Sequence, residues 1–441
     1  MRIMRLVKYL PFFVVITLFF YPDIMKYVRG REFPCFDVVG FGIRLTEIIL
    51  FMLFFFMILS FLLNKTSRDR ILILSRQLRS MRLYFLIGLA FLILGFFQGY
   101  LSGNPILLLD IRGMSYIVFV AVFISSVRSI SQIRRAFKIF YIALIILSIS
   151  NLATINYDFY GTVGKYSNLT VQMSLYVFCL SISFSIYFSK NRLLYRGIAT
   201  LSLLSILASL MKFAILSLFV AIIGSMLLID KNNRTKLVKS TFALVLILML
   251  SGVILLKSNL GDFLAQSQSN STLEDFFYKQ YLRSDIGDIS SGRFAMWNQI
   301  FNEAIKRPFI GKGLGVEGFK FETIEILVHE HNIIFWSMRR FGLIAAIIFI
   351  LLGIKFYNFA FSVYRGEENP INKALLHASL VYCLAYLFIN LVSIMVFTFE
   401  SAVIFWLNVS IVFLLHREQL AKSQIGRAAR QNSITSHLRP R

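Results

Sequence analysis

The feature that most constrains this chain is the recurrence, along its whole length, of apolar stretches of about 20 residues. A helix of that length crosses the hydrocarbon core of a bilayer, which is roughly 30 Å thick. Of the 441 residues, 57% are hydrophobic and only 15% are charged. A soluble domain usually carries roughly 25% charged residues. The sequence therefore predicts an all-α, polytopic membrane protein.

The apolar pattern predicts about twelve transmembrane helices. The predicted spans lie near residues 9–21, 42–63, 83–99, 114–127, 139–155, 169–189, 197–211, 213–229, 240–256, 341–359, 374–393 and 398–415. The first of them follows Met1–Lys8 without a small-residue cleavage site, so we expect a retained anchor.

Lys and Arg concentrate in the short segments between the apolar stretches. Segment 64–82, for example, holds six of them against one acid. The basic segments are 64–82, 128–138, 190–196, 230–239 and the tail after His416. In a twelve-span arrangement they all fall on one side, which we expect to be cytoplasmic, with both termini there.

The net charge of +24 does not indicate a nucleic-acid partner, because the charges lie between membrane spans. Anionic lipid headgroups are the better partner for such clusters. The three cysteines, Cys35, Cys179 and Cys383, are scattered and form no CxxC motif. Their spacing indicates neither a disulfide framework nor a zinc or redox site.

Four regions follow from this topology. Residues 1–256 hold the first nine spans, 257–340 form one long outer loop, 341–415 hold the last three spans, and 416–441 form a basic cytoplasmic tail whose part after Leu420 we expect to be disordered. The outer loop contains ten of the 22 Asp and Glu residues. Loops of this length are often functional.

The outer loop is predicted to contain a helix. A possible serine cap at Ser290–Ser291 precedes apolar residues at helical spacing, and Pro308 and Gly311 end the pattern. The apolar residues are Phe294, Trp297, Ile300, Phe301, Ala304 and Ile305.

Two of the five histidines stand at the end of this loop, in the run His329, Glu330, His331, Asn332. A neutral imidazole near a membrane surface can accept a proton from a sugar hydroxyl, because its pKa lies close to working pH. The alternative is a polar cap on an interfacial helix. The spacing of His329 and His331 does not place both on one helical face, which disfavours a metal site.

Four basic residues are candidates for binding an anionic group: Arg293 at the start of the loop helix, Arg283, Lys212 and Arg112. An arginine can bind phosphate through two parallel hydrogen bonds. Ionisable residues at membrane depth are costly and often mark a site, as Lys212 and Arg112 would. The alternatives are solvated arginines, a snorkelling lysine, and an ion pair between Arg112 and Asp110.

No nucleotide site is indicated. Gly311–Gly315 has the sequence GKGLG, which lacks the spacing of a P-loop and has no strand–turn–helix context. An enzyme working on the outer side without ATP needs a substrate that is already activated.

The segment from Ser291 to Ile344 resembles the motif region of the O-antigen ligase and Wzy-type polymerase superfamily. Gly292–Arg293 leads into the helix with Trp297, and Arg307–Gly313 resembles the proline–glycine turn of that superfamily. His331–Asn332, nine residues and then Gly342 reproduce its H-N-x9-G pattern.

The resemblance implies a GT-C-like glycosyltransferase of the bacterial inner membrane whose long loop and active site face the periplasm. It implies transfer of a glycan from undecaprenyl diphosphate to an acceptor sugar, with no cofactor and no metal. His331 would be the base or orienting group for the acceptor hydroxyl, and Arg293 a phosphate clamp. Met211–Lys212 takes the place of a Ser–Arg pair of the family, and lysine lacks the bidentate geometry of arginine. Arg112, Arg283, Asn332 and His329 complete the predicted substrate-binding set.

Alternatives remain at two levels. Within the superfamily, a ligase transfers the glycan to lipid A-core, whereas a polymerase adds it to a second lipid-linked repeat; we favour the ligase because the motifs lie in one long loop. Outside it, the chain could transport lipid-linked sugars or serve as a membrane scaffold. Transporters tend to show internal repeats, and no clear repeat is found here.

Overall fold

The computed structural model describes residues 77–127, 166–188, 190–208, 212–229, 293–316, 319–321, 324–328, 332–392 and 399–437, with scattered residues in 51–62 and 131–146. The predicted spans at 9–21 and 240–256 lie outside the described residues, and those at 42–63 and 139–155 lie mostly outside them. The total of twelve spans therefore stays a prediction.

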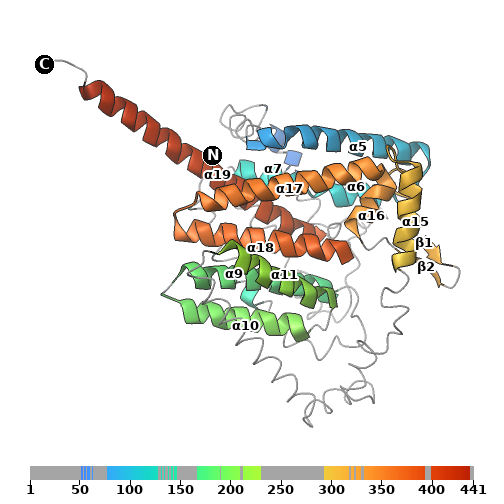
Figure 1. The fold of residues 1–441 in the computed structure, drawn as a ribbon, viewed down its shortest axis with the longest axis horizontal. Helices are drawn as coiled ribbons and strands as arrows, with labels where there is room; N and C mark the ends of the chain where they lie inside the picture. Colours follow the sequence, from blue (N-terminus) through green and yellow to red (C-terminus); the bar gives the residue numbers. More distant parts are fainter. Residues whose placement is uncertain are drawn as a thin grey trace, which may run out of the picture.

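The described part of the chain is predominantly helical (Figure 1). A 3-10 turn, η1 (Leu78–Ser80), precedes α5 (Arg82–Leu101), α6 (Leu107–Ser115), α7 (Val118–Ser126), α9 (Tyr166–Tyr187), α10 (Arg192–Ala208), α11 (Lys212–Leu228), α15 (Arg293–Lys306), α16 (Ile333–Phe341), α17 (Leu343–Arg365), α18 (Pro370–Val392) and α19 (Phe399–His437). Between α15 and α16, β1 (Phe319–Phe321) and β2 (Ile324–Val328) pair as an antiparallel hairpin.

Four of the described helices are long and apolar enough to cross a membrane, which supports the predicted polytopic membrane fold. Each overlaps a predicted span. The four segments are Arg82–Leu101, Leu343–Arg365, Pro370–Leu391 and Ala402–Gln424. Shorter apolar helices run over Gln172–Tyr187 and Ala214–Leu228, also at predicted spans.

One predicted span is divided. Residues 114–127 are expected to form a single helix, but α6 and α7, of nine residues each, meet within this region. At the junction the N–H of Ile117 donates to the carbonyl of Met114, and that of Phe119 to Tyr116, at 3.3 and 3.0 Å. These bonds span three residues instead of four, so the chain tightens into a 3-10 turn between the two helices.

The basic tail is helical over most of its length, which corrects the expectation of disorder. Helix α19 continues from the apolar segment through to His437. Arg417 donates to the carbonyl of Val127 at 2.9 Å, and Gln419 donates to that of Val363 at the same distance. Glu418 and Lys422 form an ion pair one turn apart. These contacts hold the first turns after the apolar segment against α7 and α17, and a helix once formed extends readily.

The spans run side by side, and the loops between them gather at two ends (Figure 1). At one end, hereafter the site end, the α5–α6 connection meets the chain that follows α15. Asn104 donates to the carbonyls of Lys312 and Leu314 at 3.1 and 2.8 Å. Asn332, before α16, donates to the carbonyl of Leu391 in the last turn of α18 at 2.8 Å.

The opposite end collects basic residues. Arg134 donates to the side-chain oxygen of Asn372, near the start of α18, at 2.9 Å. Arg417 of α19 bonds the carbonyl of Val127, which ends α7. Both arginines belong to the segments that the charge pattern places in the cytoplasm, so the structure brings two of these segments to the same end of the bundle.

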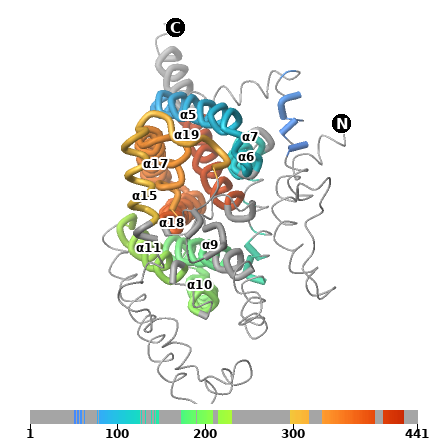
Figure 2. The backbone as a smooth tube through the Cα atoms, turned by 90° about the vertical axis from the view of Figure 1, so that its right-hand side faces the viewer, coloured from blue at the N-terminus to red at the C-terminus, as the bar shows by residue number. Residues whose placement is uncertain are grey.

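The interior of the bundle lies between α9, α18 and α19 (Figure 2). The rings of Tyr176 in α9 and Tyr382 in α18 contact each other in a tilted arrangement, with centroids 4.9 Å apart, and both side chains are fully buried. By contrast, α5 exposes most of its apolar side chains, and most of those of α17 are partly buried or exposed. Such faces are suited to contact with lipid.

Candidate functional site

The seven predicted site residues differ in how far the structure describes them. Arg112 and Asn332 are described with their side chains. Arg293 and Lys212 are described as the first residues of α15 and α11, without their side chains. Arg283, His329 and His331 lie outside the described residues.

Helix α15 confirms the helix predicted in the long loop, almost residue for residue. Its buried side chains Met296 and Ile300 pack against Phe335 and Met338 of α16. Trp297 stacks on Phe335, with ring centroids 5.3 Å apart and an interplanar angle of 11°. The helix that Arg293 opens is thereby fixed on the helix that follows His331.

Asn332 is the N-cap of α16. Its side-chain oxygen accepts hydrogen bonds from the N–H groups of Ile334 and Phe335 at 2.8 and 3.3 Å, which satisfies donors that the first helical turn leaves unpaired. Its side-chain nitrogen donates to Leu391 of α18. The asparagine of the H-N pair therefore joins α16 to the end of α18 and fixes the backbone next to His331.

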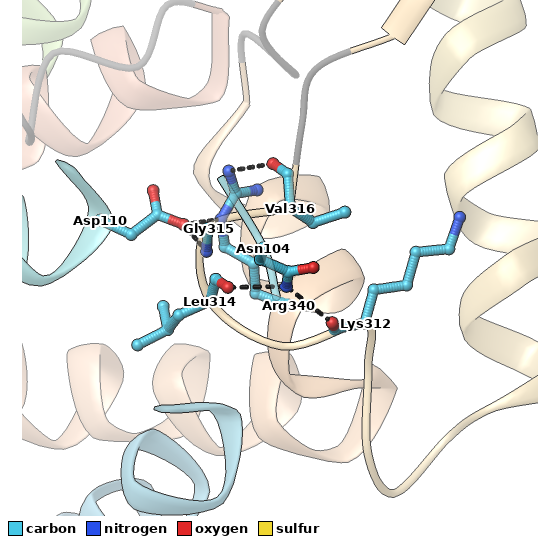
Figure 3. A network of polar contacts seen from close by, with 7 residues as sticks. All are labelled: Asn104, Asp110, Lys312, Leu314, Gly315, Val316 and Arg340. Atoms are coloured by element: carbon cyan, nitrogen blue, oxygen red, sulfur yellow. Dashed lines mark hydrogen bonds and ion pairs between the residues drawn. The ribbon is translucent and has the colours of Figure 1, made fainter. Parts of the chain in front are cut away.

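The Gly311–Gly315 segment, the glycine turn, closes the other end of α16 (Figure 3). The N–H groups of Lys312 and Gly313 donate to the carbonyls of Arg339 and Arg340 at 2.7 and 3.0 Å. The N–H of Leu314 donates to Gly95 of α5 at 2.8 Å. The turn thus caps the C-terminal end of α16 and fastens it to α5.

Two glycines are needed for this close approach. Gly313 and Gly315 have φ angles of +87° and +75°, in the region that residues with a side chain rarely adopt. A Cβ on Gly313 would overlap the backbone of Gly99 in α5, and one on Gly315 would overlap the backbone of Leu107 in α6. The GKGLG sequence is therefore a packing motif that lets one backbone lie directly on another.

A buried ion pair lies behind the turn. Arg340 of α16, which is 1% exposed, donates from Nε to Oδ2 of Asp110 in α6 at 2.5 Å. The same carboxylate oxygen accepts the N–H of Gly315 at 2.7 Å. The guanidinium lies 4.6 Å from the ring centroid of Trp336 and donates from Nη2 to the carbonyl of Val316 at 3.4 Å. One charge pair thus holds α6, the turn and α16 together.

The sequence analysis did not predict Arg340 as a residue of the site end, although its position beside an apolar run could have indicated it. Asp110 and Arg340 each stand in or beside an apolar run, where an ionisable residue needs a partner. The sequence suggested Arg112 as the partner of Asp110. In the structure Asp110 binds Arg340, 230 residues away.

Arg112 is half-buried in α6. Residues two apart in a helix point roughly 200° apart, so Arg112 and Asp110 leave α6 on nearly opposite sides. Asp110 points to the glycine turn, and the carbonyl of Arg112 accepts a hydrogen bond from the side chain of Ser115 at 2.7 Å. The site end therefore carries Arg112 together with the Asn332 cap and the buried Asp110–Arg340 pair.

Among the described residues, no group of three or more His, Cys, Asp or Glu side chains is arranged to hold a metal ion. The polar groups described at the site end are guanidinium, amide and backbone N–H groups, together with the carboxylate of Asp110, which is paired with Arg340. Such groups can bind an anion and orient it, and they can fix the backbone beside His331.

Comparison with known proteins points to one family. Residues 197–350 match the family model described as O-antigen ligase. No curated protein matches the chain. The matched segment contains most of α10, then α11, α15, the glycine turn, α16 and the first turns of α17, and it includes every predicted site residue except Arg112. The match supports the resemblance of this segment to the O-antigen ligase and Wzy-type polymerase superfamily that the sequence motifs indicate.

Proposed function

We propose that this protein is an inner-membrane glycosyltransferase that moves a glycan from undecaprenyl diphosphate to an acceptor sugar on the periplasmic face, most simply as an O-antigen ligase acting on lipid A-core. The observation that carries the proposal is that the family match covers the ordered sequence motifs, and that the described parts of these motifs pack together at one end of the bundle. There α15, the glycine turn and the capped α16 are packed into a single unit.

The candidate donor site is cationic. Lys212 and Arg293 are the first residues of α11 and α15, where backbone N–H groups add partial positive charge. Arg112 lies in α6 at the same end as α15, and Arg283 precedes α15 in the sequence. These cations would bind the diphosphate and stabilise the negative charge that develops on it as the glycosidic bond breaks.

His331 would act on the acceptor. Its imidazole accepts the proton of the acceptor hydroxyl as that oxygen attacks the anomeric carbon from the face opposite the diphosphate, which inverts the configuration. The undecaprenyl diphosphate leaves with the bonding electron pair. Asn332 serves as a positioning residue, since its three hydrogen bonds fix the backbone that carries His331. His329 would contact the glycan.

The proposed orientation rests on charge. The end opposite the site gathers Arg134 and Arg417 from the basic segments. Basic segments remain in the cytoplasm, so the site end faces the periplasm and both termini are cytoplasmic.

The test is transfer by the purified protein in detergent, without nucleotide or metal. Undecaprenyl-diphosphate-linked glycan is supplied with lipid A-core or, separately, with a second lipid-linked repeat. We expect glycan on lipid A-core. Longer lipid-linked chains would make the protein a polymerase. If no product forms while labelled lipid-linked sugar crosses a liposome bilayer, the proposal is wrong and the protein is a transporter.

His331→Ala should abolish transfer while the protein still inserts in the membrane and elutes as a single species. His437→Ala, at the end of α19, is the matched control and should retain parental activity. Full activity of His331→Ala would exclude the proposed role.

A further inference from the structure

Helix α15 carries a second apolar surface besides the one that packs on α16. Met296, Ile300 and Ala304 are buried, whereas Phe301 and Ile305, one position further on, are 41% and 52% exposed. After the helix ends, Phe309 and Ile310 are 66% and 45% exposed. Phe301, Ile305, Phe309 and Ile310 are hereafter the apolar edge. Exposed apolar side chains grouped in one short segment are typical of a site of contact with a partner or a membrane.

The depth of the apolar edge is fixed by its contacts with α17. The N–H of Ile344, in the first turn of α17, donates to the carbonyl of Pro308 at 3.1 Å. A Cβ on Gly342 would lie 2.7 Å from that carbonyl and 3.1 Å from the nitrogen of Ile310. Phe309 and Ile310 therefore lie at the level where the α17 span begins, which is the boundary between hydrocarbon and headgroups.

The orientation of α15 fits that boundary. The helix runs across the site end, roughly perpendicular to α5, α17 and α18, and thus parallel to the membrane plane (Figure 1). Seen from the site end, it lies along one side of the bundle, over α17 (Figure 2). The exposed Tyr100 near the end of α5 is of the residue type that concentrates at membrane interfaces.

Charge complements this arrangement. Lys306 and Arg307 are exposed between Ile305 and Phe309, so cationic groups flank the apolar edge. Glu303, the acid nearest to them in α15, is paired with Lys312 of the glycine turn at 2.8 Å. A helix with apolar residues beside lysine and arginine is typical of segments that lie in a bilayer surface and bind lipid phosphates.

We propose that α15 and the turn that follows it form an interfacial anchor, in which the apolar edge inserts into the membrane leaflet at the site end and Lys306 and Arg307 contact lipid phosphates. The anchor fixes the depth of the glycine turn and of α16 relative to the bilayer surface. It requires only that the chain spans a membrane, and it stands whether or not the proposed glycosyl transfer is correct.

The test measures depth in the full-length protein. The three native cysteines, Cys35, Cys179 and Cys383, are replaced by alanine, and single cysteines carrying a nitroxide are placed at Ile305 and Phe309. Gln299 and Asn302 are the matched controls, because they are exposed polar positions on the same helix and Gln299 points about 120° away from Ile305 around the helix axis. The protein is studied in nanodiscs of phosphatidylethanolamine and phosphatidylglycerol, with oxygen and a water-soluble nickel chelate as collision partners.

We expect a several-fold higher ratio of oxygen to nickel collisions at Ile305 and Phe309 than at Gln299 and Asn302. Equal ratios at all four positions would place the edge in water and overturn the proposal. Protection of Ile305 and Phe309 from both reagents would also overturn it, because protein, either another segment or a second copy, would then cover the edge.

A conservative variant provides an independent measurement. Phe309→Trp should add fluorescence that lipids brominated near the headgroup quench more strongly than lipids brominated near the chain end. Asn302→Trp should show little quenching by either. If the added fluorescence at Phe309 is as insensitive to brominated lipid as that at Asn302, there is no anchor.

Discussion

Nε of Arg340 lies 2.5 Å from Oδ2 of Asp110, across 230 residues of sequence, and both side chains are almost completely buried. A buried ion pair does not by itself imply a large net contribution to stability, because both charges lose their hydration. The main consequence of this pair is that it fixes the relative positions of the elements that it joins. While the pair is intact, α6, the glycine turn and α16 keep one arrangement, and a single unpaired charge in its place would be costly.

Removing one partner of this pair should destabilise the protein strongly. Arg340→Met leaves the Asp110 carboxylate buried without its cationic partner, although it still accepts the hydrogen bond from the N–H of Gly315. We expect the free energy of unfolding to fall by about 3–5 kcal/mol. Unfolding in mixed detergent micelles measures this. The double variant Asp110→Asn/Arg340→Met should lose less than the sum of the two single losses, because Asn can still accept the Gly315 N–H.

The matched control is Arg365→Met. Arg365 also lies over an aromatic ring, 4.3 Å from that of Phe361, but it is exposed. Its replacement should cost about 1 kcal/mol or less. Equal losses for Arg340→Met and Arg365→Met, or additive losses in the double variant, would contradict the positional role of the buried pair.

Gly313→Ala should be the most damaging of three glycine substitutions. It combines a φ of +87° with overlap of the α5 backbone, so we expect a loss above about 2 kcal/mol in the free energy of unfolding. Gly103 has a φ of +65° and nothing within 4 Å, so Gly103→Ala should cost about 1 kcal/mol from the backbone alone. Gly353, inside α17 with open space around it, should tolerate alanine with a gain of about 0.5–1 kcal/mol.

The three glycine variants are compared in the same unfolding assay. A loss at Gly313 no larger than that at Gly103 would mean that the turn can move away from α5, so that the contact between the two backbones is not required.

Asn332→Ala should lower kcat for glycosyl transfer more than it raises KM, because the Asn332 amide is engaged with Ile334, Phe335 and Leu391 and acts, in our proposal, through the backbone beside His331. The lost cap should cost about 1 kcal/mol of stability. Asn332→Asp keeps the acceptor for Ile334 and Phe335 but loses the donor to Leu391. Its activity should fall between those of the parent and Asn332→Ala. A change confined to KM would instead make Asn332 a substrate contact.

The membrane orientation can be tested with two exposed positions in the background without native cysteines. Asn302→Cys, on α15, should react with an impermeant maleimide added to spheroplasts. Ser423→Cys, at the polar C-terminal end of the segment Ala402–Gln424 in α19, should react only after the inner membrane is permeabilised. The reverse pattern would place the site end in the cytoplasm. The proposed site could then not reach a lipid-linked glycan donor on the periplasmic face, and that part of the proposal would be wrong.

The sequence alone determined the features that depend on local composition and period. Apolar length located the four long described spans and placed their first residues within a few positions of the observed ones, because hydrophobic thickness acts on each segment separately. The limits of α15, expected from the spacing of Phe294 to Ile305 and from Pro308, agree with Arg293–Lys306 for the same reason. The family motifs also lie in consecutive residues and can be read directly.

Only the tertiary structure decided which distant residues meet. Three such contacts depend on how whole helices pack. Asp110 binds Arg340, Gly313 lies on Gly99, and Asn332 joins α16 to α18. A buried charge needs a partner, but its own segment does not specify which one, because many cations in the chain have suitable chemistry and packing alone brings one of them within reach. The continuation of α19 through the basic tail likewise follows contacts with α7 and α17 that no local pattern contains.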